Sequence, residues 1–261
     1  MSSMRSHTGP VALLGIDCAV SRTNLGAAVG VFTQGRLRCS GFVEPVPSAM
    51  AAWLREQRAA GRPVLVALDA PLGWPEDLGA SLASHSAGEE LPGERNLLFR
   101  RETDRWVRAR IGKQSLDVGA DRIARTAHAS LELLTALRQE ADEALPMIWS
   151  PEALSTGGSI EVYPAATLRA WSFPNAGYKG ASEVGRSKRR EILACMTGAG
   201  VDVPEALRQE ALASDHRLDA LICLLAGHDF LAGLCSPPEN LPQAQKEGWM
   251  WVREPTSSNV P

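Results

Sequence analysis

Two stretches of the chain are apolar almost throughout and end close to an aspartate. Residues 11–19 read VALLGIDCA and residues 62–70 read RPVLVALDA. The first predicts a buried strand, and the second is typical of strands buried on both faces in a parallel arrangement. Asp17 and Asp69 stand where the apolar runs stop. A carboxylate in that position is costly unless a partner uses its charge, so both acids are candidates for function.

The pattern of the remaining chain predicts an α/β fold. Alternating or β-branched runs predict a hairpin over residues 24–32 and 36–43 and a short strand over 159–164, closed by Pro164. Helices are expected over 48–60, with Ser48 as N-cap and Gly61 as the stop, and over 183–199 and 214–234. Turn residues after Pro71 and helical stretches near 97–111 and 119–143 indicate a helical insertion at about 76–155. We expect one domain over 11–253, with loose ends at 1–10 and 254–261.

Composition narrows the class of protein. With 261 residues, 44% hydrophobic and 22% charged, the chain is long enough for a large core and ordinary for a globular domain. It has no apolar run that would span a bilayer and no signal-peptide pattern, so no membrane association and a cytoplasmic location are expected. A net charge of −3 argues against nonspecific coating of nucleic acid. Two local basic surfaces are nevertheless expected, over residues 95–113 and 185–190.

The last long helix carries a pair of acids. Asp215 and Asp219 are four residues apart and therefore project on one face, where like charges repel unless a cation lies between them. The sequence that follows, ALICLLAG, is apolar nearly all round and indicates a buried helix. Because ligands gather at the carboxyl ends of strands in open α/β sheets, Asp17 and Asp69 are expected near each other. The four acids, with Glu161 in support, suit a hard cation such as Mg²⁺ or Mn²⁺.

Each acid taken alone has a structural explanation as well. Asp17 is also suited to capping a turn, Asp69 to organising a β-turn through Pro71, and Asp215 to capping its helix. Glu161 is placed by alternation where it can point to solvent. Taken together, the acids indicate a metal site more strongly than any one of them does alone. Phosphate-binding glycine loops, a metalloprotease H-E-x-x-H motif and a G-x-S-x-G elbow are all absent from the sequence.

The motifs together resemble those of the DUF429 family, whose members are described as predicted nucleases of the ribonuclease H-like fold. The matching pieces are GID (15–17), DAPLG (69–73), R-x-T-D (101–104), IEVYPAA (160–166), YK (178–179), DHRLDALIC (215–223) and EGWMW (247–251). The resemblance implies a mixed sheet, with three antiparallel strands followed by parallel strands, flanked by helices. It also implies that Asp17 and Asp69 are the strand acids and that Asp219, with Asp215, supplies the helix acid. A Glu is common in such nucleases where Asp69 stands here.

Other motif residues are candidates for substrate contact. Arg101 is suited to binding a phosphate that Asp104 orients, with Thr103 between them, or the group is a solvated ion pair on a helix. Lys179 is either a phosphate contact or an ordinary surface lysine. His216, beside Asp215, is a weaker candidate for proton transfer, and Trp249 and Trp251 are more typical of a core than of base stacking.

Three functions fit these features. The first is a nuclease or phosphodiesterase that depends on Mg²⁺ or Mn²⁺ and acts on DNA or RNA. The second is an actin-like nucleotide-binding phosphotransferase, although those proteins usually need two such domains. The third is a noncatalytic nucleic-acid-binding or scaffold protein that retains the fold. The oligomeric state is open.

Overall fold

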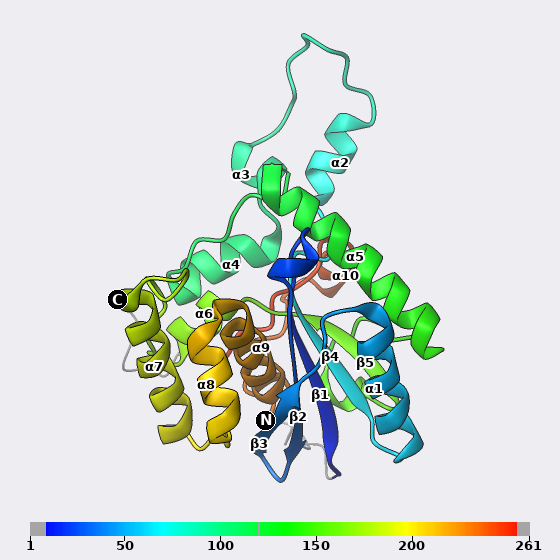
Figure 1. The fold of residues 1–261 in the computed structure, drawn as a ribbon. Coiled ribbons are helices and arrows are strands. Elements are labelled where there is room, and N and C mark those ends of the chain that lie inside the picture. Colours follow the sequence, from blue (N-terminus) through cyan, green and yellow to red (C-terminus); the bar gives the residue numbers. More distant parts are fainter. Residues whose placement is uncertain (1–8, 120, 255–261) are drawn as a thin grey trace.

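The computed structural model describes residues 9–119 and 121–254, which form a five-stranded sheet with helices on both faces (Figure 1). The strands are β1 (Val11–Asp17), β2 (Gly26–Thr33), β3 (Arg36–Phe42), β4 (Val64–Asp69) and β5 (Gly157–Glu161). Their order is β3-β2-β1-β4-β5. β1 and β3 run antiparallel to β2, whereas β4 runs parallel to β1 and β5 parallel to β4. The expected mixed α/β sheet, antiparallel and then parallel, is confirmed.

Every residue of β1 is buried, because alternate side chains enter two different cores. Leu13 packs on the side of α9 (Asp215–Leu231), and Leu14 packs on the side of α1 (Pro47–Ala59) and α5 (Asp121–Ala141). α6 (Pro164–Ala170), α7 (Glu183–Gly198) and α8 (Glu205–Ala213) contribute to the same core as α9 (Figure 1). This alternation decides which acids share a face.

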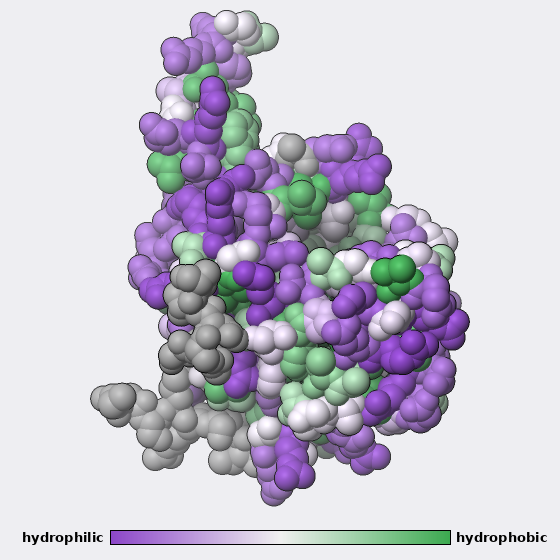
Figure 2. Space-filling model, turned by 90° about the vertical axis from the view of Figure 1, so that its left-hand side faces the viewer, coloured by the Kyte–Doolittle hydropathy of each residue, from purple (hydrophilic) through white to green (hydrophobic). Residues whose placement is uncertain are grey.

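The segment between β4 and β5 is helical, and part of it projects beyond the sheet (Figure 1). It contains α2 (Glu76–Leu82), α3 (Arg95–Phe99), α4 (Glu102–Ile111), α5 and the 3₁₀ turn Pro151–Ala153. Figure 2 shows apolar side chains among the polar ones on the projecting part, where Leu82 and Leu97 are exposed. The single helix expected over 97–111 is divided, because Arg100 and Arg101 are extended.

A carboxylate from the C-terminal part of the chain anchors this insertion. Glu247, at the end of α10 (Leu241–Glu247), accepts hydrogen bonds from the backbone N–H groups of Glu76 and Glu102 at 2.8 and 2.7 Å. These groups belong to the first residues of α2 and α4, where free N–H donors favour a negative charge. The C-terminal part of the chain therefore fixes the two helices that lead out of and back to the sheet.

Several boundaries differ from the pattern-based prediction. α1 begins at Pro47 after Val46, so Ser48 is not its N-cap, because proline is well suited to the first helical position. The strand expected over 159–164 ends at Glu161, and Pro164 begins α6 for the same reason.

Within the described residues, the C-terminal segment forms isolated β-bridges from Met250 to Glu161 and from Arg253 to Cys235, and it adds no further strand to the sheet. Trp249 and Trp251 are buried, which confirms the core interpretation. Nearly all of the residues expected to form loose ends, 1–10 and 254–261, lie outside the part of the chain that the structure describes. No helix among the described residues is long and apolar enough to cross a membrane.

Candidate metal centre

The two strand acids lie side by side at the carboxyl ends of β1 and β4. Asp17 and Asp69 are paired in the parallel register, so both side chains point to the same face. Alternation gives Asp17 the face of Leu13 and Asp69 the face of Leu65 and Ala67, which is the face covered by α9. Register and alternation thus bring together two acids that are 52 positions apart in the sequence.

Asp219 reaches the same place from α9, which packs unusually close to the sheet. A Cβ added to Gly15 would lie 2.4 Å from the carbonyl oxygen of Ala220, and one added to Gly26 would lie 2.2 Å from that of His216. Glycine is therefore required at both positions for the helix to approach. One carboxylate oxygen from each of Asp17, Asp69 and Asp219 lies within 4.8 Å of the other two.

The burial of this cluster raises its electrostatic free energy. Asp219 is fully buried and Asp17 is 5% exposed. Burial and then the charges of Asp17 and Asp219 raise the pKa of Asp69 well above its usual range. Burial likewise raises the pKa of Asp219, although Lys179 opposes the shift. Three oxygen-donating acids whose charges are incompletely balanced form a donor set that fits a hard divalent cation.

Two cationic side chains border the acids. The ammonium of Lys179 forms an ion pair with Asp219, which also accepts a hydrogen bond from the Tyr178 hydroxyl at 2.9 Å. Nδ1 of His216 lies 2.7 Å from Oδ2 of Asp17. This hydrogen bond raises the pKa of His216 despite partial burial. The side chain of Lys179 is 56% exposed, so its charge is accessible from solvent.

A buried arginine holds the segment that supplies Tyr178 and Lys179. Arg189 in α7 donates to the carbonyl oxygens of Tyr178 and Gly180 at 2.7 and 2.8 Å and to that of Leu212 at 3.0 Å. The sequence placed Arg189 in an expected basic surface, but only 3% of it is exposed. No short motif indicates this role, because the acceptors are backbone atoms in other elements.

Glu161 lies apart from the three-acid cluster, which differs from the expected role as a supporting metal ligand. In the parallel register it pairs with Leu68, one position before Asp69, and so it has the opposite alternation from Asp69. Its carboxylate accepts two hydrogen bonds from Arg101 at 2.8 and 2.9 Å and one from the Leu72 N–H at 2.9 Å. Glu161 therefore positions the turn that follows Asp69.

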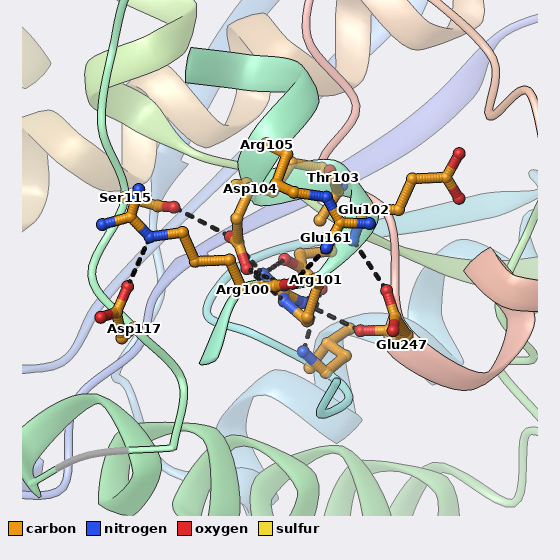
Figure 3. Close-up of polar contacts among 12 residues, drawn as sticks. Arg100, Arg101, Glu102, Thr103, Asp104, Arg105, Ser115, Asp117, Glu161 and Glu247 are labelled. Atoms are coloured by element: carbon orange, nitrogen blue, oxygen red, sulfur yellow. Dashed lines mark hydrogen bonds and ion pairs between the residues drawn. The ribbon is translucent and has the colours of Figure 1, made fainter. Parts of the chain in front are cut away.

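The R-x-T-D motif forms a buried network around the same arginine (Figure 3). Arg101 is 1% exposed and also donates to both carboxylate oxygens of Asp104, at 3.1 and 3.2 Å. Thr103 accepts a hydrogen bond from the Met250 N–H at 2.8 Å. From the sequence, Arg101 is expected to contact a substrate phosphate that Asp104 orients. In the structure, its guanidinium group instead donates hydrogen bonds to Glu161 and Asp104. The motif joins the insertion to the sheet.

Asp215 is not part of the cluster, although it precedes Asp219 by one helical turn. It is the first residue of α9, and its Oδ2 accepts a hydrogen bond from the Gly180 N–H at 3.0 Å. Partial burial opposes ionisation, but this bond and His216 lower the pKa of Asp215 below its usual value. The carboxylate is satisfied locally and reinforces the position of the Tyr178–Gly180 segment.

The model of a family described as "Protein of unknown function (DUF429)" matches residues 15–243, a range that includes all three acids. Searches of curated proteins and of solved structures found no significant match.

Proposed function

The chain belongs to the DUF429 family, and from the site that it carries we propose a divalent-metal-dependent phosphodiesterase that acts on nucleic acid. The observation that carries this proposal is the convergence of Asp17, Asp69 and Asp219 within 4.8 Å at the carboxyl ends of two parallel strands. These three residues would hold Mg²⁺ or Mn²⁺. A cation bound there supplies an activated water and neutralises charge on the phosphate.

The neighbouring side chains have distinct roles in this proposal. His216 holds the carboxylate of Asp17 in one orientation through the 2.7 Å contact. Lys179 balances the charge of Asp219 and, being half exposed, presents a cation to an incoming phosphate. Asp215 and Arg189 keep the Tyr178–Gly180 segment in place, so they act on the site through other residues.

A polyanionic substrate is supported by exposed arginines of the insertion. Arg95, Arg108 and Arg110 of the insertion are exposed, whereas Arg101 is not. Exposed arginines favour phosphates through long-range attraction that salt weakens. The sequence has no glycine-rich phosphate loop, which favours a phosphodiester over a nucleoside triphosphate as the substrate.

Cleavage assays test the proposal. Labelled single- and double-stranded DNA and RNA are incubated with the wild type, Asp17→Asn and Asp215→Asn, in Mn²⁺, Mg²⁺ or EDTA. We expect cleavage that requires the cation and falls by at least about 100-fold in Asp17→Asn. The loss is expected to be smaller in Asp215→Asn, because that acid acts on the site only through the Tyr178–Gly180 segment. Equal cleavage by Asp17→Asn and the wild type would exclude this site, and no cleavage of any substrate would favour a binding protein.

A further inference from the structure

A cavity of about 280 Å³ opens beside the acids and has one charged and one apolar side. Asp17, Asp69 and Lys179 line the charged side, together with the mutually paired Arg101, Asp104 and Glu161. The apolar side is made by residues from three separate parts of the chain, namely Leu116, Ile123, Val162, Tyr163 and Met250. Charged groups and an apolar surface therefore meet in one cavity that is open to solvent on one side.

We propose that this cavity binds a single unpaired nucleotide of the substrate, with its base against the apolar side and its phosphate at the acids. This inference rests on the proposed phosphodiesterase function and adds the substrate class: a strand end or an unpaired residue of DNA or RNA, rather than a continuous duplex.

The size of the cavity favours one nucleotide. A volume of about 280 Å³ is close to the lower end, roughly 300 Å³, of sites that enclose small ligands. The bases of a duplex are stacked and paired, so a base enters a recessed cavity only when it is unpaired or turned out of the helix. A paired substrate would leave the apolar side of this cavity empty.

The apolar side is suited to contact with a base. Val162 and Met250 are buried, so their side chains are held in place by packing. Leu116, by contrast, is 69% exposed. The ring of Tyr163 is uncharged at neutral pH like that of any tyrosine, and burial and then the charge of Asp69 raise its pKa further, to about 12. Apolar and aromatic contact with a base is favourable for every base, because each has a π-face.

The polar groups of the wall are already occupied, which predicts weak discrimination among bases. The hydroxyl of Tyr163 donates to the Gln114 carbonyl at 3.3 Å, that of Ser115 to Asp104 at 2.9 Å, and that of Thr126 to the Arg122 carbonyl at 3.0 Å. Base identity is read by hydrogen bonds to base edges, and these donors are committed elsewhere. We therefore expect selection for unpaired nucleotides with little sequence preference.

The test compares Leu116→Ser with Leu82→Ser. Both leucines are exposed in the insertion, but Leu82 is not among the residues that line the cavity, so it controls for general effects of the substitution. Cleavage in Mn²⁺ is measured on single-stranded and blunt duplex DNA and RNA 12-mers of equal length. We expect the wild type to prefer single strands by at least about tenfold, and Leu116→Ser to raise KM for them about tenfold while Leu82→Ser does not.

A binding measurement separates this inference from the proposed function. Fluorescence anisotropy of the labelled 12-mers is recorded in Ca²⁺, which takes the same kind of oxygen ligands, so that no turnover is required. Tighter binding of single strands, weakened by Leu116→Ser, supports the inference even if no cleavage is found. Equal binding of duplex and single strand, no binding of either, or an unchanged affinity in Leu116→Ser overturns it. Metal-dependent cleavage that requires Asp17 would then still stand.

Discussion

Asp17, Asp69 and Asp219 repel one another as long as no cation lies between them. Their oxygens lie within 4.8 Å in a largely buried setting, and Lys179 and His216 compensate only two of the carboxylates directly. Like charges at such distances favour the protonated form of one member. The site is therefore expected to lower the stability of the metal-free protein, a common consequence of holding charges ready for a ligand.

The pH dependence of the stability of Asp69→Asn measures the free-energy cost of this repulsion. The raised pKa of Asp69 means that the folded state binds its proton more tightly than the unfolded state, so stability is lost as pH rises through the folded-state pKa. Asparagine does not titrate. In EDTA we expect Asp69→Asn to melt about 2–4 °C above the wild type at pH 8, with a smaller difference at pH 5.

Differential scanning calorimetry in EDTA checks this, with Asp202→Asn as a control because Asp202 is exposed on the surface. A lower melting temperature for Asp69→Asn at both pH values, or a difference that does not change with pH, would contradict the electrostatic account.

Arg101 is expected to act through stability. Arg101→Met leaves Glu161 and Asp104 buried without their shared cation, which costs about 3–5 kcal/mol. Urea unfolding of Arg101→Met and of Arg108→Met, in which an exposed arginine is replaced, measures the difference. Wild-type stability together with weaker substrate binding in Arg101→Met would instead identify a phosphate contact.

At the scale of elements, the site depends on the close approach of α9 to β1 and β2. Gly15 and Gly26 allow the backbone of the helix to contact the backbone of the strands, and Asp219 directly precedes Ala220, whose carbonyl faces Gly15. A shift of α9 away from the sheet would carry Asp219 away from both strand acids. Packing of this kind couples the stability of the domain to the geometry of the metal centre.

Gly15→Ala tests this coupling. The added Cβ would lie 2.4 Å from the Ala220 carbonyl oxygen, so α9 must move, and overpacking of this kind costs about 1–3 kcal/mol. We expect a lower melting temperature and weaker Mn²⁺ binding by calorimetric titration. Gly41→Ala is the matched control in β3, because its added Cβ meets nothing nearer than 3.7 Å. Mn²⁺ affinity that is unchanged in Gly15→Ala would show that α9 does not position the site.

For the whole molecule, the sequence indicates the α/β class of the fold and the three acids of the cluster, because the patterns that predict them are local. Apolar runs that end at Asp17 and Asp69, and an acid inside an apolar helix at Asp219, are visible without a structure. The relation of Glu161 to Asp69 is not, because it depends on register, which one residue of shift reverses. Arg101 and Arg189 look like surface charges in sequence, since their acceptors lie in distant elements.

The most direct test of the central claim is the melting temperature of EDTA-treated protein before and after addition of Mn²⁺, for the wild type and Asp17→Asn. A ligand that binds only the folded state at 100 times its Kd adds about 2.7 kcal/mol, which corresponds to roughly 5–10 °C in a domain of this size. The account predicts that rise in the wild type and its loss in Asp17→Asn. No rise in the wild type, or an equal rise in both proteins, would contradict a metal centre at Asp17, Asp69 and Asp219.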